Sequence, residues 1–159
     1  LVPLAVQPPV PPADETRTEA SVATDTPTPS IDERREAVER AVHREVNERR
    51  RDHGVAPIAL SETQSDLARE HSRDMLRDHY FNHTAPDGKT HLPSCRPTAE
   101  NIVEVNGDVF NADRMAEKAV DQWMDSPGHR EILLDPRWTS EGIGMATPIG
   151  HAYITQNFC

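Results

Sequence analysis

Residues 141–158, close to the C-terminus, read EGIGMATPIGHAYITQNF. Two runs that could form strands, 141–147 and 151–158, flank the triplet Pro148-Ile149-Gly150. Proline and glycine between two such runs are typical of a turn, so this stretch predicts a closing β-hairpin. The hairpin decides the fold class, because most of the patterned sequence before it has the periodicity of helices rather than strands.

Two amphipathic helices are predicted in the first half of the chain. The first begins at Ser30 and Glu33, whose spacing is that of a capping box, and stops at Gly54. The second begins at Ser61 and Gln64, which predict another capping box, and carries apolar residues at helical spacing along one face.

Further elements lie between these helices and the hairpin. A third helix opens near Asn111 and stops at residues 126–128, and residues 132–134 add one more helical turn. Residues 99–105 form a short apolar stretch that fits either a strand or a helix, and 80–98 has the turn chemistry of a loop. Helices first and a hairpin last predict an α+β layered domain.

The N-terminal segment has a different composition. Residues 1–29 contain the run Pro8-Pro9-Val10-Pro11-Pro12, followed by Thr, Asp, Glu, Ser and Pro. Such a segment buries too little apolar surface to fold, so we expect a linker or tether at 1–29 and the folded domain at 30–159. Tethers of this kind often follow an export signal or anchor, and the alternative is a tail without a role.

Charge and hydropathy exclude several partners. The chain of 159 residues has 17 Lys and Arg against 27 Asp and Glu, a formal net charge of -10. Phosphate binding needs a basic surface, so we expect no nucleic-acid partner and no docking to anionic lipid. No stretch approaches the ~20 apolar residues of a spanning helix, so we expect no membrane insertion within this chain.

Cys95 and Cys159 are the two cysteines. As a disulfide they would close a loop of about sixty residues and stabilise the fold by ~4 kcal/mol through loop entropy. A bridge fits export to an oxidising compartment, and the linker favours this interpretation. The alternative is two unpaired thiols in a cytosolic chain.

The eight histidines differ in their surroundings. His43 and His53 lie on or after the charged first helix, and we interpret them as solvated surface. His71 lies on the apolar face of the second helix, where a histidine is usually a hydrogen-bonded core group. His83 and His129 stand in turn-rich breaks and are candidates for chemistry, although no metal-binding spacing motif is present.

Six motifs follow one another along the chain in a specific order. They are 67–75 (LAREHSRDM), 81–88 (FNHTAPDG), 99–102 (AENI), 123–130 (WMDSPGHR), 142–144 (GIG) and 155–158 (TQNF). In series they resemble the CAP superfamily, also called SCP domains, which holds cysteine-rich secretory proteins, antigen 5 and pathogenesis-related proteins. The WxxSPGHR form is similar to prokaryotic members. The resemblance implies a three-layer α-β-α sandwich with a small, largely antiparallel sheet, and secretion or surface display.

The resemblance also implies a cleft with two histidines and two glutamates that can bind a divalent cation such as Zn. His83 matches the first histidine and Glu100 the glutamate of the G-E-N motif. Ser126 and Tyr153 stand where many members have the other two ligands, and His129 fills part of that gap. We therefore expect a three-residue metal site of His83, Glu100 and His129, or else a hydrogen-bonded cluster of the same residues without metal.

Three functions remain open at this point. The first is a secreted or surface-tethered monomeric module, without catalytic residues, that binds a small apolar ligand, a glycan or a protein in the His83/Glu100 cleft. The second is a metal-dependent hydrolase in which Glu100 acts as a base. The third is a structural protein of the cell envelope with a relict cleft.

Overall fold

The computed structural model describes residues 27–108, 111–148 and 150–159. Most of the predicted linker, residues 1–26, lies outside the described residues. The elements in chain order are α1 (Ile31–Asp52), β1 (Ala59–Leu60), α2 (Glu62–Asp78), β2 (Ala99–Asn106), α3 (Ala112–Asp125), α4 (Pro127–Leu133), β3 (Ser140–Ala146) and β4 (His151–Phe158). The first three predicted helices and the hairpin are therefore confirmed, and the ambiguous stretch at 99–105 is a strand. The last helix differs from the prediction, because α4 already begins at Pro127, within the predicted break, and ends at Leu133.

The sheet has four strands in the order β1-β3-β4-β2. The hairpin strands β3 and β4 are antiparallel, as are β4 and β2, whereas the short β1 runs parallel to β3. The sheet is largely antiparallel, as expected, with one parallel pair at its edge. The other edge of the sheet is β2.

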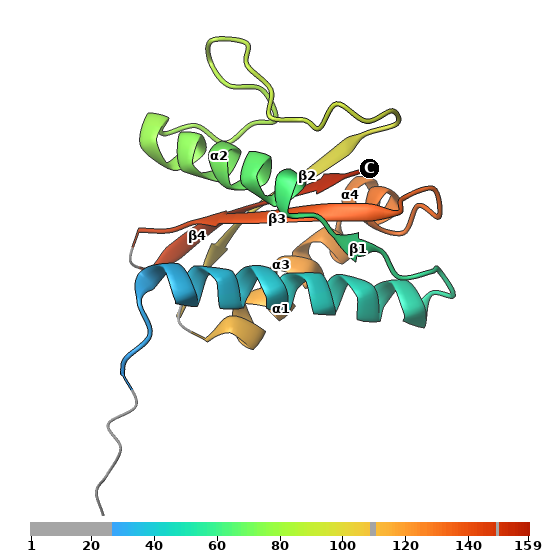
Figure 1. The fold of residues 1–159 in the computed structure, drawn as a ribbon, viewed down its shortest axis with the longest axis horizontal. Coiled ribbons are helices and arrows are strands. Elements are labelled where there is room, and N and C mark those ends of the chain that lie inside the picture. Colours follow the sequence, from blue (N-terminus) through green and yellow to red (C-terminus); the bar gives the residue numbers. More distant parts are fainter. Residues whose placement is uncertain (1–26, 109–110, 149) are drawn as a thin grey trace, which may run out of the picture.

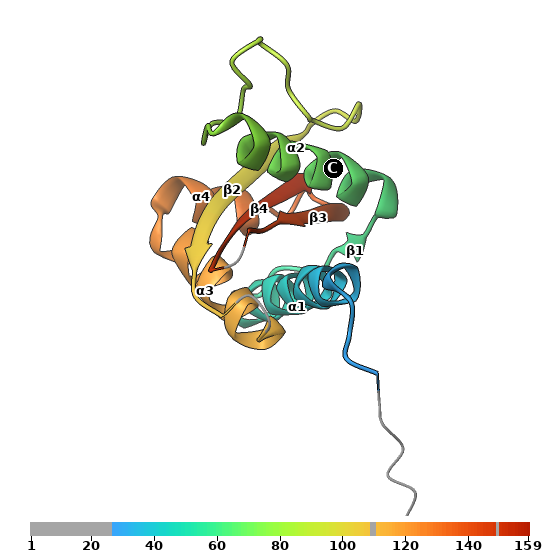
Figure 2. The same cartoon turned by 90° about the vertical axis from the view of Figure 1, so that its left-hand side faces the viewer.

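Helices cover both faces of this sheet. Helix α2 lies on one face, and α1, α3 and α4 lie on the other (Figure 1). The view at a right angle shows the same three layers, with β2 at the edge beside α3 and α4 (Figure 2). The α-β-α sandwich is thus confirmed. Its core includes the fully buried Trp123 and Phe158.

Two glycines of β3 allow α2 to approach the sheet closely. A Cβ atom on Gly144 would lie 2.0 Å from the backbone nitrogen of Arg69, and one on Gly142 would lie 2.1 Å from the carbonyl carbon of Gln64. Atoms cannot approach to these distances, so only glycine permits this packing. The GIG motif therefore fixes the position of α2, the helix that carries His71.

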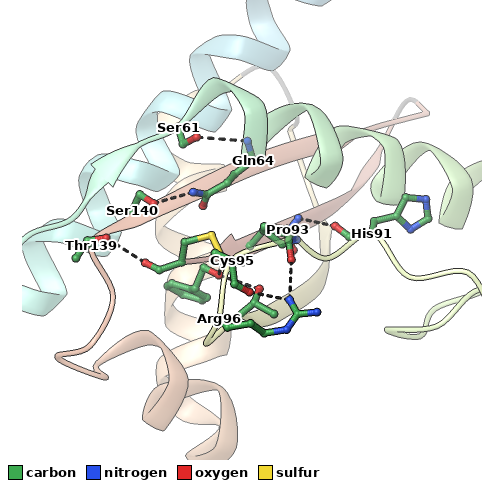
Figure 3. The surroundings of a disulfide bond; sticks show 12 residues. Ser61, Gln64, His91, Pro93, Cys95, Arg96, Thr139 and Ser140 are labelled. Atoms are coloured by element: carbon green, nitrogen blue, oxygen red, sulfur yellow. Dashed lines mark hydrogen bonds between the residues drawn. A yellow bond between two sulfur atoms is a disulfide. The ribbon is translucent and has the colours of Figure 1, made fainter.

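The two predicted capping boxes have different outcomes. Ser30 and Glu33 form a complete box, with Glu33 N donating to Ser30 Oγ at 3.2 Å and Ser30 N donating to Glu33 Oε2 at 2.7 Å. At the start of α2 only Gln64 N donates to Ser61 Oγ. The Gln64 amide instead donates to Ser140 Oγ at 2.7 Å, so the reciprocal half of the second box was predicted wrongly (Figure 3). A tertiary partner on β3 displaced the local one.

Cys95 and Cys159 form a disulfide with an S–S distance of 2.01 Å (Figure 3). The bridge joins the loop between α2 and β2 to the end of the chain after β4. Cys159 is also held by its backbone, since Cys159 N donates to Ser140 O at 3.0 Å. The predicted pairing is confirmed, and it fastens to the sheet the loop that carries His83.

Helix α3 protects the edge strand β2. Carbonyl oxygens of alternate β2 residues accept hydrogen bonds from α3 side chains. The pairs are Ile102 O with Trp123 Nε1 at 3.2 Å, Glu104 O with Gln122 Nε2 at 3.5 Å, and Asn106 O with Lys118 Nζ at 2.9 Å. Occupied carbonyls hinder the pairing of another strand with this edge.

Candidate functional site

The loop after α2 places His83 against Glu100, the second residue of β2. His83 Nδ1 lies 2.8 Å from Glu100 Oε1. The Glu100 side chain is only 3% exposed, whereas that of His83 is 53% exposed. The buried carboxylate therefore orients a half-exposed imidazole, and the Nε2 atom of His83 remains for a ligand or solvent.

A second imidazole, His71, holds the other oxygen of Glu100. His71 Nδ1 lies 2.8 Å from Glu100 Oε2, and His71 Nε2 lies 3.0 Å from the carbonyl oxygen of Asn82. The ring is thus held between a carboxylate and a backbone carbonyl, both of which are hydrogen-bond acceptors. The ring is fully buried and stacks on His91 with centroids 4.7 Å apart. The prediction of a hydrogen-bonded core histidine is confirmed, and the same residue positions the carboxylate.

These contacts perturb the titration of the site. Burial raises the pKa of Glu100, but the hydrogen bonds and charges of His71 and His83 outweigh it and hold that pKa below 4.5. The hydrogen bond to Glu100 raises the pKa of His83 above 6.5, with burial opposing it. The cleft therefore favours an ionised Glu100, and the pair stabilises the protonated form of His83 relative to a free imidazole.

His129 lies on α4 beside this pair, but its ring belongs to a neighbouring cavity that Phe81 and Ser126 also line. The backbone oxygen of His129 accepts a hydrogen bond from Asn101 Nδ2 at 3.3 Å. Burial lowers the pKa of His129, and the positive charge of His83 lowers it further. The two imidazoles thus influence one another electrostatically while lining different cavities.

The cavity at His83 and Glu100 has a volume of about 320 Å³. Its wall combines apolar and polar side chains from the loop, β2 and α4. The lining residues are His83, Thr84, Thr90, Leu92, Ala99, Glu100 and Ile132. A cavity of this size and mixed lining suits a small ligand with an apolar body and a polar head.

The expected three-ligand metal site of His83, Glu100 and His129 stays a prediction. Within the described segments, the ligand atoms of His83, Glu100 and His129 are not gathered within 4.8 Å of one another. Both oxygens of Glu100 already accept from imidazoles, an arrangement typical of a carboxylate that lies behind a metal-binding histidine. Ser126 and Tyr153 add only hydroxyl groups. Glu100 therefore fits the place of a carboxylate behind a metal-bound histidine rather than that of a ligand. The imidazole nitrogens of His83 and His129 are then the atoms that could bind an ion.

One other group in the described ranges brings three potential ligand atoms within 4.8 Å: Glu70, Asp74 and His91. The protein supplies its own cations there. Lys89 Nζ lies 2.6 Å from Glu70 Oε1, and Arg77 Nη1 lies 2.8 Å from Asp74 Oδ1. His91 Nε2 lies 2.9 Å from Asp74 Oδ2. Because both carboxylates are already paired, this group is better explained as an ion-pair cluster that anchors the loop.

The interpretation of His43 as solvated surface is wrong. His43 Nδ1 lies 2.6 Å from Oε1 of Glu141, a fully buried carboxylate on β3. Gln156 Nε2 donates to the other oxygen of Glu141 at 2.6 Å, and Asn101 Nδ2 donates to Gln156 Oε1 at 3.1 Å. With the bond from Asn101 to the His129 backbone, a polar chain crosses the domain from α1 to the cleft. The residues around His43 in the sequence are mostly charged, so the local pattern could not predict that its partner is the buried Glu141.

A three-layer α-β-α domain with a histidine–carboxylate cleft beside an edge strand is the architecture of SCP-type domains. Residues 43–158 match the family model of the cysteine-rich secretory protein family, CAP. The chain belongs to this family, as the motif series predicts. The match includes every residue of the cleft discussed above.

Similar proteins come from several bacteria. The uncharacterised protein YkwD of Bacillus subtilis is 30% identical over 108 residues, which are 68% of this chain and 42% of YkwD. The chain spans less than half the length of the curated relatives it matches. Among solved structures, an outer surface protein of Borrelia burgdorferi superposes with a TM-score of 0.64 at 18% identity, covering 76% of this chain and 90% of the Borrelia protein. An extracellular SCP-domain protein of Bacillus anthracis gives 0.58 at 23%, covering 84% and 44%.

Proposed function

We propose that this CAP domain is a secreted or surface-displayed binding module that takes a small amphiphilic molecule in the 320 Å³ cavity at His83. The observation that carries the proposal is the His83–Glu100 pair, which presents an oriented imidazole beside the apolar side chains of Leu92 and Ile132. Glu100 and His71 fix the ring, Nε2 of His83 is the atom left to contact the polar head, and the apolar wall buries the tail.

An extracellular setting is supported by two features. The disulfide between Cys95 and Cys159 persists best in an oxidising compartment. The similar structures include a protein described as extracellular and one described as an outer surface protein. None of the helices in the described segments has the length and apolar composition needed to cross a bilayer.

Binding can be tested with decanoate as the probe, measured by isothermal titration calorimetry. We expect saturable binding that weakens at least tenfold in His83→Ala and is unchanged in His53→Ala. His53 is a matched control because it is an exposed histidine at the end of α1. Equal affinities for the two variants, or no binding by the native protein, would refute the proposal and favour a relict cleft.

We further propose that a divalent ion such as Zn²⁺ binds at the imidazole nitrogens of His83 and His129, with Glu100 behind His83. A bound ion would supply a Lewis acid for an oxygen of the ligand. Thermal unfolding with Zn²⁺ and with a chelator tests this: a stabilising shift in the native protein should be lost in His83→Ala and kept in His53→Ala. A shift that survives in His83→Ala would place the ion elsewhere.

Hydrolysis is a second candidate function, favoured by one observation. A carboxylate that orients an imidazole with a free Nε2 is also the arrangement of a general base. His83, rather than Glu100, would then accept the proton from water, because both Glu100 oxygens are already bonded. Turnover of ester or peptide substrates that disappears in both His83→Ala and Glu100→Gln would support this candidate over a pure binder.

A further inference from the structure

Two more cavities continue from the first along the edge strand β2. The first cavity includes Ala99 and Glu100 of the strand; the second, of about 260 Å³, is lined by residues 102–104, and the third, of about 430 Å³, by residues 104–106. The second and third share Glu104 and Gln122 and so adjoin one another, and we call the two together the β2 groove. Figure 2 shows β2 at the sheet edge with α3 and α4 alongside.

The length of the β2 groove suits a chain-like ligand. The groove follows residues 102–106, and five strand residues at about 3.3 Å each span roughly 16 Å. The cavity at His83 occupies the beginning of the strand, and the β2 groove follows its remaining half. An occupant that fills the groove must therefore be extended along β2.

The bonding of β2 argues against an extended peptide as that occupant. A peptide that joins a sheet edge relies on backbone hydrogen bonds to the edge strand. Here the outward carbonyls of β2 already accept from Trp123, Gln122 and Lys118 of α3. The ligand must instead be recognised by side chains.

The side chains of the second cavity combine an exposed aromatic ring with polar groups, including the carboxylate of Glu104. Phe81 is 49% exposed and forms one wall. Ser126, Gln122 and His129 contribute a hydroxyl, an amide and an imidazole. An aromatic face with amide and hydroxyl groups around it matches a sugar ring, which has apolar C–H faces and a rim of hydroxyls.

The charges of the third cavity exclude anionic chains. Glu104, Asp121 and Asp125 line it together with Lys118, whose ammonium donates to a β2 carbonyl. Asp121 is paired with Arg49, so Glu104 and Asp125 supply the negative charge that repels an anion. The whole chain has a net charge of -10, which adds to the repulsion of sulfated or uronic-acid polymers. Neutral sugars and amino sugars meet no such barrier.

We propose that the β2 groove binds a neutral or amino-sugar glycan chain, several sugar units long, by stacking on Phe81 and hydrogen bonding to Gln122, Ser126 and Glu104. This proposal does not depend on the occupant of the cavity at His83. It gives the module a polymer partner in addition to a small molecule.

The test uses a hexamer of N-acetylglucosamine and its deacetylated form as probes, with the folded protein, in calorimetric titrations. We expect saturable binding of at least one hexamer, weakened about tenfold or more in Phe81→Ala. The matched control is Leu92→Ala, since Leu92 is an exposed apolar residue of the same loop that faces the cavity at His83. It should change the affinity less than twofold.

Amide chemical shifts of the native protein give a second measurement. The hexamer that binds should perturb residues 102–106 and 122–126 more than residues 83–92. The proposal is overturned if neither hexamer binds, if Phe81→Ala and Leu92→Ala have equal effects, or if a heparin hexasaccharide or a lysine-rich decapeptide binds more tightly. Loss of decanoate binding in His83→Ala is a separate result and does not bear on the groove.

Discussion

Replacing His71 by alanine should lower the free energy of unfolding by about 3–5 kcal/mol, the range for depriving a buried charged group of one partner. The ring is fully buried, and its two hydrogen bonds join Glu100 to the Asn82 carbonyl. Without it, the buried carboxylate keeps only His83 as a partner, and a cavity replaces the imidazole. At about 4 °C per kcal/mol, the midpoint of thermal unfolding should fall by about 12–20 °C.

Urea unfolding at pH 7, with the disulfide intact, measures this change, and a double-mutant cycle identifies its cause. Glu100→Gln removes the charge while keeping the shape of the side chain. In that background His71→Ala should cost about 2 kcal/mol less than in the native protein, because no carboxylate is left without its partner. If His71→Ala lowers the free energy of unfolding equally in both backgrounds, His71 acts only through packing. The conclusion that His71 positions the carboxylate of Glu100 would then be refuted.

Three other perturbations test separate parts of the structure. Gly144→Ala should destabilise the fold by about 1–3 kcal/mol or more in urea unfolding, because its Cβ would meet the backbone of α2, whereas Gly128→Ala, which meets nothing within 4 Å, should have little effect. Reducing the disulfide should lower the free energy of unfolding by about 4 kcal/mol, and a variant with both cysteines replaced by serine should not respond to reductant. Glu100→Gln should lower the pKa of His83, followed by NMR titration of its ring protons, because it removes the bond that raises it; an unchanged value would contradict the pairing.

The pH dependence of stability follows from the same pair. In the folded protein the pKa of His83 is above 6.5. The stability that His83 contributes is therefore fully present below pH 6.5, and it is lost as the pH rises through this raised pKa. In the folded protein the pKa of Glu100 is below 4.5. The stability that Glu100 contributes is therefore present above pH 4.5, and it is lost as the pH falls through this lowered pKa. Stability from this pair should therefore be greatest between about pH 4.5 and 6.5, and thermal unfolding of the native protein and Glu100→Gln across pH 3–9 measures the difference.

Half of the chemistry of the cleft could be predicted from the sequence. His83 and Glu100 stand in motifs whose order along the chain indicates the family, and the structure places them 2.8 Å apart. The contribution of His71 could not be predicted, because a histidine on the apolar face of a helix looks the same whether its partner is a backbone carbonyl or a carboxylate of the cleft. The position of His129 in the neighbouring cavity depends on where α4 docks, which no local pattern encodes.

The sequence alone was enough to predict the helices, the closing hairpin and the loop at 80–98, because capping residues, turn residues and apolar periodicity depend on a few neighbouring positions. The order of the short motifs was enough to indicate the family. The tertiary structure alone decided that the amide of Gln64 leaves its cap for Ser140, that His43 binds a buried glutamate, and that both oxygens of Glu100 are occupied. In each case a polar side chain exchanged a local or solvent partner for one distant in the sequence. A buried polar group must find a partner, and which partner it finds depends on how the layers pack.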